Sequence, residues 1–406
     1  MLVNKLIFVI IINSMGSVSK NKHKKIKKQP LKKAPSKLAL IFGGIFVILI
    51  MVVYGFYTLI RVNQVFAANF ADNVLRPIIG NQATITIEAV FFGVEDHVNR
   101  VKYSFVKSNP LEFTQASTVV NKSAENFTGF DLGRISSLSF FPLFPGEDEW
   151  TPIYSGTSEA LMAKTFVRPD PQRSYAVAYL VKMNMNNLLL SAVAGIREPG
   201  GKNNPGPGKI PTEAQKSNML VAAFNGGFQE KDGHYGMVVN QKTYLPLQNN
   251  LASMVIYNGA KPKIINYNGQ DLSKNVVAVR QNGPMLLENS KDVTSSNTWN
   301  MQTWGLTTTN SMYTWRSGIG ITKNGDLIYA AGPSLIPQTL AAALKAAGAV
   351  NAMQLDINPV WVRFVVFNPL GSGLYNYYSL TKDMVNGGYQ DLIGYQKDFF
   401  YLVKKQ

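Results

Sequence analysis

The sequence predicts an α+β domain, with a mixed β-sheet core and packed helices, preceded by a single N-terminal transmembrane helix. Three observations lead to this prediction. Near the N-terminus, a long uncharged segment directly follows a lysine-rich segment. In the C-terminal part of the chain, short apolar runs alternate with glycine-containing turns, which is typical of strands and hairpins. One segment between these runs has the composition and the end signals of a helix.

The composition excludes several kinds of site. The chain has 406 residues, 46% of them hydrophobic, which is ample for a packed core. Because it has no cysteine, disulfides, thiolate metal sites and a cysteine nucleophile are excluded. Only three histidines occur and no HExxH pattern, which excludes a multi-histidine zinc site. We therefore expect neither a metal ion nor a cofactor.

The net charge of +16 is concentrated near the N-terminus. Residues 20–37 are rich in lysine and contain no acid, and residues 38–60 then carry no charge at all. As a helix, residues 38–60 span about 34 Å at about 1.5 Å per residue, which is enough to cross a bilayer. The lysines before this segment predict that the N-terminus is cytoplasmic and the bulk of the chain is extracytoplasmic. A nucleic-acid-binding tail is the rival interpretation, but the adjoining apolar segment argues against nucleic acid as a partner.

These features predict a single-pass protein of the cell membrane with four regions. They are a basic cytoplasmic tail (1–37), a transmembrane helix (38–60), an extracytoplasmic stalk or juxtamembrane module (61–158) and a C-terminal domain (159–406). The apolar residues 2–12 are too short to span a bilayer, so either Met15 is the true start or this segment is an interfacial patch.

The stalk region has mixed patterns. Residues 67–75 and 84–106 carry apolar residues at three-and-four spacing, which is consistent with one or two amphipathic helices. Residues 108–154 are rich in Ser, Thr, Asn, Phe and Pro. We interpret them as part of a stalk or small module.

The C-terminal domain begins with two predicted strands, at 175–181 and 188–193, and a flexible loop at 195–211. Lys209 in this loop is followed by isoleucine and not by Ser or Thr, so the loop is not a Walker motif. Thr212 and Gln215 form a plausible capping box on a short helix.

The turn at residues 225–228 organises the domain. The apolar run 221–224 ends in Asn225, Gly226 and Gly227, which predicts a buried strand that breaks at two glycines. We expect a positive φ at Gly226. Glycines let a ligand approach main-chain N–H groups closely, while Asn225 offers a donor and an acceptor. A tight turn between two core strands is the alternative.

Further elements follow in order. Residues 253–263 and 318–330 predict hairpins that turn at Asn258-Gly259 and Asn324-Gly325. Residues 337–347 predict a helix, with Pro337 near its start and Gly348 after its end. A strand at 352–355 ends at Asp356, and an acid at the end of a buried strand is a candidate catalytic group.

The motifs occur in a characteristic order. They are NGGF at 225–228, RQNGPML at 280–286, WRSGIGI at 315–321, NGDL at 324–327 and QLD at 354–356. In order and spacing, residues 159–401 resemble the phosphodiester glycosidase family, which cleaves sugar–phosphate diesters and whose bacterial relatives are linked to exopolysaccharide biosynthesis. One departure concerns the segment after Asp356, where the family has a glycine-serine turn and this chain has Ile357-Asn358-Pro359-Val360.

The resemblance implies the following roles. Asp356 is the catalytic carboxylate, which activates water or acts as nucleophile, and Arg316 is the cation that holds the phosphoryl oxygens, which a guanidinium does well. The alternatives are that Asp356 is a helix or turn cap and that Arg316 is a surface residue on a strand edge. Asn225 is the third predicted catalytic residue and would help to orient the substrate. The predicted substrate-binding residues are Gly226, Gly227, Asn282, Gly283 and Asn358. Glu230, Asp232 and His234 could furnish an acid or base, but a solvated loop is the alternative.

Two functions are therefore carried forward. The first is a membrane-anchored cell-surface hydrolase, a glycosidase that cleaves sugar-1-phosphodiester bonds in envelope glycopolymers. The second is a catalytically inactive family member that binds envelope polysaccharide or assists its assembly, which the changed segment after Asp356 would suit.

Overall fold

The structure is a computed structural model, and the residues it describes lie almost all in the C-terminal two thirds of the chain. Described are residues 55, 74, 77–80, 100–101 and 130–405, the last range without 137, 139–141, 157–158, 295–303, 305–312 and 385–386. The chain divides into two units, Met1–Leu59 and Ile60–Gln406. The fold below concerns the second unit.

The predicted transmembrane anchor needs correction. In the part of the chain that the structure describes, no helix is both long enough and apolar enough to cross a membrane. The single-pass localisation is therefore not supported. The segment that motivated it, residues 38–60, lies outside the described residues except for Gly55, as do most of the helices expected at 67–75 and 84–106.

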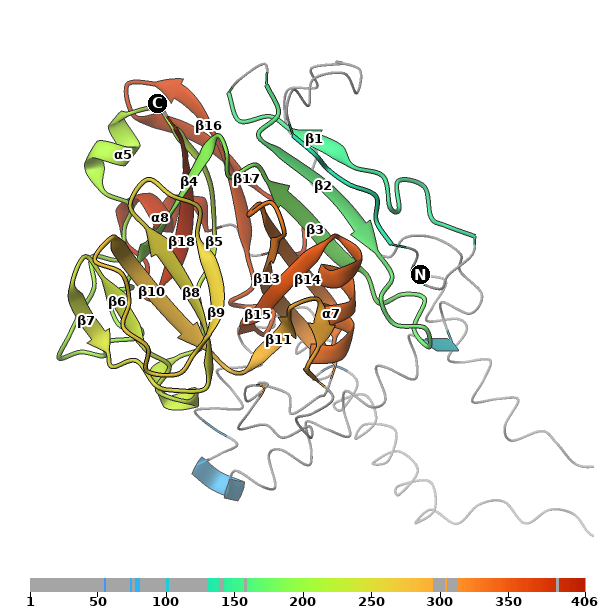
Figure 1. The fold of residues 1–406 in the computed structure, drawn as a ribbon, viewed down its shortest axis with the longest axis horizontal. Helices are drawn as coiled ribbons and strands as arrows, with labels where there is room; N and C mark the ends of the chain where they lie inside the picture. Colours follow the sequence, from blue (N-terminus) through green and yellow to red (C-terminus); the bar gives the residue numbers. More distant parts are fainter. Residues whose placement is uncertain are drawn as a thin grey trace, which may run out of the picture. The chain divides into compact units, whose positions relative to one another are not determined.

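Three antiparallel sheets form the domain (Figure 1). The largest has eight strands in the order β1-β2-β3-β14-β13-β15-β11-β12. Its strands are β1 (Thr151–Ile153), β2 (Met162–Val167), β3 (Ala178–Met183), β11 (Met285–Glu288), β12 (Lys291–Asp292), β13 (Thr314–Thr322), β14 (Leu327–Leu335) and β15 (Ala349–Ile357). We call it the large sheet.

The other two sheets have five strands each. The first, in the order β17-β16-β5-β18-β4, consists of β4 (Leu188–Val193), β5 (Leu220–Asn225), β16 (Phe364–Gly371), β17 (Leu374–Ser379) and β18 (Phe399–Lys404). The second, in the order β7-β6-β10-β8-β9, consists of β6 (Met237–Val239), β7 (Lys242–Leu245), β8 (Leu251–Tyr257), β9 (Lys263–Tyr267) and β10 (Val276–Asn282). They are the β5 sheet and the β10 sheet below.

All three sheets contribute to one hydrophobic core. It joins Tyr329 of the large sheet, Phe224 of the β5 sheet and Met254 of the β10 sheet, all fully buried. The outer face of the large sheet is covered by α7 (Pro337–Ala346). The outer face of the β5 sheet has its own apolar cluster, which includes residues next to the short helices α5 (Thr212–Lys216) and α8 (Gly388–Ile393).

Glycines in β13 let α7 pack closely. Gly318 and Gly320 alternate with Ile319 and Ile321, so one face of the strand is bare and the other is apolar. A Cβ atom on Gly318 would lie 3.1 Å from the Leu340 side chain of α7, while Ile319 and Ile321 point into the main core. The alternation of glycine and isoleucine thus lets one face of β13 pack closely against α7 and the other face pack into the main core.

The predicted fold class, α+β, is wrong because the described domain is mostly β-sheet. Several individual elements are nevertheless present. The helix predicted at 337–347 is α7, the strand at 188–193 is β4, and both hairpin turns have a glycine with positive φ, Gly259 at 67° and Gly325 at 83°. The capping box is not formed, since α5 has no side-chain cap and Gln215 instead donates to Ile210 O and Leu392 O.

Candidate active site

Asn225 ends β5 and is held by the aromatic core. Phe224, the residue before it, stacks on Phe364 with ring centroids 5.8 Å apart and lies 5.5 Å from the ring of Tyr329. The Tyr329 hydroxyl and the Arg363 backbone N–H both donate to Asn225 Oδ1, at 3.0 and 3.1 Å. The Asn225 amide donates to Ser317 Oγ at 2.9 Å and to Gly226 O at 3.1 Å. Because its amide nitrogen and oxygen are both hydrogen-bonded within the protein, Asn225 has a supporting role in the site and links β5 to β13.

The glycine turn after Asn225 is fixed by an ion pair. Asp398 accepts from Gly227 N at 3.1 Å and from Arg280 Nε at 2.8 Å, and Arg280 also donates to Phe228 O at 2.8 Å. The positive φ expected at Gly226 is wrong, since neither Gly226 nor Gly227 has one. The reason for glycine is close approach, because a Cβ atom on Gly226 would collide with the Asp398 carboxylate.

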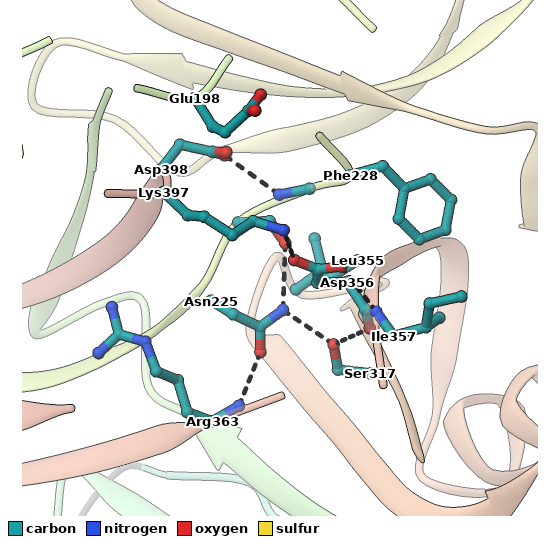
Figure 2. Close-up of polar contacts among 12 residues, drawn as sticks. Glu198, Asn225, Phe228, Ser317, Leu355, Asp356, Ile357, Arg363, Lys397 and Asp398 are labelled. Atoms are coloured by element: carbon teal, nitrogen blue, oxygen red, sulfur yellow. Dashed lines mark hydrogen bonds and ion pairs between the residues drawn. The ribbon is translucent and has the colours of Figure 1, made fainter. Parts of the chain in front are cut away.

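Asp356 lies beside this turn at the end of β15. The pairing of β13 with β15 shifts register here, so that Leu355 and Asp356 together oppose the single residue Ser317. Such bulges redirect side chains and are common next to active sites. The Asp356 backbone N–H donates to Gly226 O at 3.1 Å, and Ser317 Oγ donates to Asp356 O at 2.7 Å. The bulge therefore fixes Asp356 against the glycine turn (Figure 2).

The carboxylate of Asp356 forms a buried ion pair with Lys397. Lys397 Nζ donates to Asp356 Oδ2, and the Ile357 backbone N–H donates to Oδ1 at 2.9 Å. Lys397 Nζ also lies 4.6 Å from the centre of the Trp361 ring. Burial raises the pKa of Asp356 to about 6, against the lowering effects of the Lys397 charge and hydrogen bond and of the Ile357 N–H. A carboxyl group with a pKa near neutrality, next to a cation, suits acid–base or nucleophilic chemistry.

The other predicted substrate residues, Asn282, Gly283 and Asn358, form hydrogen bonds within the protein. Asn282 accepts from Phe228 N at 3.1 Å and donates to Gln354 O and Leu355 O, both at 2.9 Å, so it ties the glycine turn to β15. Gly283 O accepts from Ala252 N at 2.9 Å. Asn358 has a φ of 72° and begins the turn after β15, its N–H donating to Trp315 O at 2.8 Å. Their roles in substrate binding stay predictions.

Arg316 is held by a different set of contacts. It is 0% exposed, and it donates to Leu335 O at 3.0 Å and, through Nη1, to Trp304 O and Gln354 Oε1, both at 3.1 Å. Burial lowers its pKa to about 9. These acceptors lie at the face of the large sheet that α7 covers. The phosphate-binding role of Arg316 stays a prediction, whereas the cation that the structure brings to Asp356 is Lys397.

The sequence interpretation assigned no role to Lys397, Asp398 or Arg280. Lys397 and Asp398 stand immediately before the buried strand β18 and carry two charges into an apolar segment, with exposures of 3% and 1%. That juxtaposition is the signal that could have found them, because buried charges are rare unless paired. Glu230 and His234, by contrast, are solvated, with side chains 42% and 70% exposed. Among the described residues, no group of three or more His, Asp or Glu could hold a metal ion.

The segment that contains most of this geometry also matches a known family. Residues 218–356 match the phosphodiester glycosidase family. This confirms the resemblance that the ordered motifs indicate. The matched segment includes Asn225, the glycine turn and Asp356, and it ends before Lys397. No curated protein matches the chain significantly.

Three solved structures are similar to the chain at low levels. The catalytic domain of zebrafish N-acetylglucosamine-1-phosphodiester alpha-N-acetylglucosaminidase is 15% identical with a TM-score of 0.38, covering 64% of this chain and 88% of that one. A hypothetical protein from Synechocystis is 12% identical with a TM-score of 0.30, covering 57% and 59%. A protein from Burkholderia pseudomallei described as exported is 9% identical with a TM-score of 0.32, covering 61% and 75%.

Proposed function

We propose that the chain is a hydrolase of the phosphodiester glycosidase type, which cleaves the bond between the anomeric carbon of a sugar and a phosphodiester oxygen. The observation that carries the proposal is the buried pair of Asp356 and Lys397 beside the glycine turn of Gly226 and Gly227. The match of residues 218–356 supports the same reaction class.

The reaction requires one anionic and one cationic group. Breaking the anomeric C–O bond passes through an oxocarbenium-like state, which a carboxylate stabilises or traps as a nucleophile. Asp356 supplies that carboxylate. The phosphate that leaves is negatively charged, and Lys397 supplies a point charge for its oxygens. When substrate binds, the Lys397 ammonium exchanges Asp356 for a phosphoryl oxygen, which leaves the carboxylate free to face the sugar.

The substrates we propose are envelope glycopolymers whose repeating units are joined through sugar-1-phosphodiester bonds. Asp356 and Lys397 provide an acceptor and a donor of the kind that a sugar hydroxyl and a phosphodiester require. This is the substrate class that the family resemblance suggests for a glycosidase of this type.

The test is hydrolysis by the purified full-length chain in water enriched in ¹⁸O. The substrates are a panel of sugar-1-phosphodiesters in both anomeric forms, together with isolated envelope polymers that contain such links. We expect the label to enter the sugar, because the anomeric C–O bond breaks. Label that appears only in the phosphate would identify a phosphodiesterase and contradict the proposal.

A second candidate is a binding protein without turnover. The observation that favours it is that both members of the Asp356–Lys397 pair are only 3% exposed and neutralise each other. This candidate predicts saturable binding of the same polymers with no released sugar or phosphate. The ¹⁸O measurement separates the two candidates, since binding alone incorporates no label.

A further inference from the structure

We propose that Glu198 is the general base that activates water in this reaction, so that the site has two working carboxylates with different roles. The inference rests on the proposed function. Glu198 lies in the loop between β4 and α5 and outside residues 218–356, so the family match does not identify it.

The backbone fixes Glu198 next to Lys397 and Asp398. The N–H groups of Ile196 and Glu198 donate to Tyr395 O and Gln396 O, both at 2.9 Å, so this loop runs along the segment that leads into β18. The next two residues after Gln396 are Lys397 and Asp398. Figure 2 shows the Glu198 side chain next to Asp398, which in this view lies between Glu198 and the pair that Lys397 forms with Asp356.

The Glu198 carboxylate is also held in place. Its Oε2 accepts from the Glu230 backbone N–H at 2.8 Å. A carboxylate of this kind has another oxygen for a water molecule. The contact orients the group in the way that a general base requires, because a base must lie within hydrogen-bonding distance of the proton it removes.

Accessibility distinguishes Glu198 from the other acids of the site. Asp356 is 3% exposed and Asp398 is 1% exposed, and each is occupied by a cation, Lys397 and Arg280 respectively. Glu198 is half-buried, which allows contact with both the protein interior and solvent. Bulk water can therefore reach the carboxylate of Glu198 more easily than that of Asp356 or Asp398.

The surrounding charges suit this role. Burial raises the pKa of Glu198, the Glu230 N–H and the Lys397 charge lower it, and the charges of Asp398 and Glu230 raise it. A carboxylate with a raised pKa is a stronger base than an exposed glutamate. The leaving phosphate needs no proton because it is already a stable anion, so a single base at water is sufficient.

The step is balanced as follows. The water oxygen forms a bond to the anomeric carbon, and its proton passes to the Glu198 carboxylate. The bond between the anomeric carbon and the phosphodiester oxygen breaks, and its electron pair leaves with the phosphate. Asp356 stabilises the positive charge that develops on the sugar, and Glu198 afterwards releases its proton to solvent.

The test uses the full-length Glu198→Gln variant with a sugar-1-phosphodiester and added azide. Glutamine keeps an oxygen for the Glu230 N–H but cannot take a proton, so we expect turnover in water to fall by about a hundredfold or more. Azide attacks the anomeric carbon without losing a proton. We therefore expect azide to restore turnover and to yield a glycosyl azide, detected by mass spectrometry.

Two further variants make the result specific. Glu230→Gln removes a neighbouring charge from an exposed side chain and is expected to stay within about threefold of wild type, without azide dependence. Glu198→Asp keeps the charge at a shorter reach and is expected to fall between wild type and Glu198→Gln. Thermal melts of all variants show whether they are folded.

Each other outcome overturns the inference. Normal turnover by Glu198→Gln, an equal loss in Glu230→Gln, or a loss that azide does not restore would each remove Glu198 from the reaction while leaving the hydrolase proposal intact. A wild-type chain that hydrolyses no substrate of the panel would instead overturn the proposed function, and the role of Glu198 with it.

Discussion

Two buried ion pairs near the C-terminus are built differently. In the first, Arg363 Nη1 and Nη2 donate to the two oxygens of Asp391 at 2.7 and 2.5 Å, and both side chains are 0% exposed. The rings of Tyr395 and Phe399 lie 4.4 and 5.4 Å from the guanidinium carbon. In the second, the ammonium of Lys397 meets one oxygen of Asp356 beside the glycine turn.

This difference distinguishes an ion pair that stabilises the fold from one that can take part in the reaction. A guanidinium that matches a carboxylate with two parallel bonds is fixed in orientation, and aromatic rings close it off from exchange. Arg363 also supports Asn225 through its backbone N–H. A lysine ammonium is a point charge on a flexible stem, so it can move from one anion to another. We therefore assign the Arg363–Asp391 pair to stability and the Asp356–Lys397 pair to the reaction.

The largest expected effect is on activity in Asp356→Asn. Asparagine keeps the shape but not the charge, so turnover of a sugar-1-phosphodiester should fall by about a hundredfold or more. The variant also leaves Lys397 buried without its carboxylate, which lowers stability. Rates should therefore be measured well below the melting temperature and referred to folded protein. Turnover equal to that of wild type would contradict the role of Asp356.

Asp391→Asn should show the reverse pattern. Removing one partner of a fully buried pair leaves a charge without compensation and costs about 3–5 kcal/mol of stability. We expect a large fall in melting temperature, while turnover per folded molecule stays within a few-fold of wild type. A variant with unchanged stability and lost turnover would make this pair part of the reaction and remove the contrast between the two pairs.

The pH dependence of activity sharpens the contrast further. Burial raises the pKa of Asp356 to about 6, so its carboxylate is ionised above that pH and protonated below it. Since the reaction requires the ionised form, kcat/KM should fall by up to about tenfold per unit as the pH drops below about 6. The measurement is the pH–rate profile of the wild-type chain. A profile that is flat down to about pH 5 would contradict this assignment.

The sequence allowed the local features of the site to be predicted. Asn225, the glycines after it and Asp356 were recognisable because an apolar strand that ends abruptly in polar or glycine residues is a local signal. The hairpin turns and α7 were predicted for the same reason. The fold class was not, because strands such as β16 and β18 begin as continuous buried apolar runs that do not differ in periodicity from buried helix, and they were not recognised.

The partners of these residues could not be predicted. Lys397 meets Asp356 across a sequence separation of 41 residues, and Arg280 meets Asp398 across 118. Only the packing of the β5 sheet against the other two brings them together, and no local pattern records such a contact. Glu198 was treated as part of a flexible loop, since its position depends on backbone hydrogen bonds to Tyr395 and Gln396.

The smallest expected effect concerns Arg316. This buried cation belongs to neither of the two ion pairs compared above. The family resemblance predicts that it binds phosphate, whereas its contacts with Leu335 O, Trp304 O and Gln354 Oε1 fit a structural role.

Arg316→Lys keeps the charge but loses the Nε donor to Leu335 O and the planar fork. If the role is structural, stability should fall by about 1–3 kcal/mol, with the KM for a phosphodiester unchanged. If KM for the phosphodiester rises while the melting temperature stays constant, Arg316 is the phosphate ligand and Lys397 loses that role. Thermal melts and steady-state kinetics on the same preparation, with Lys397→Arg as the matched variant, decide between the two cations.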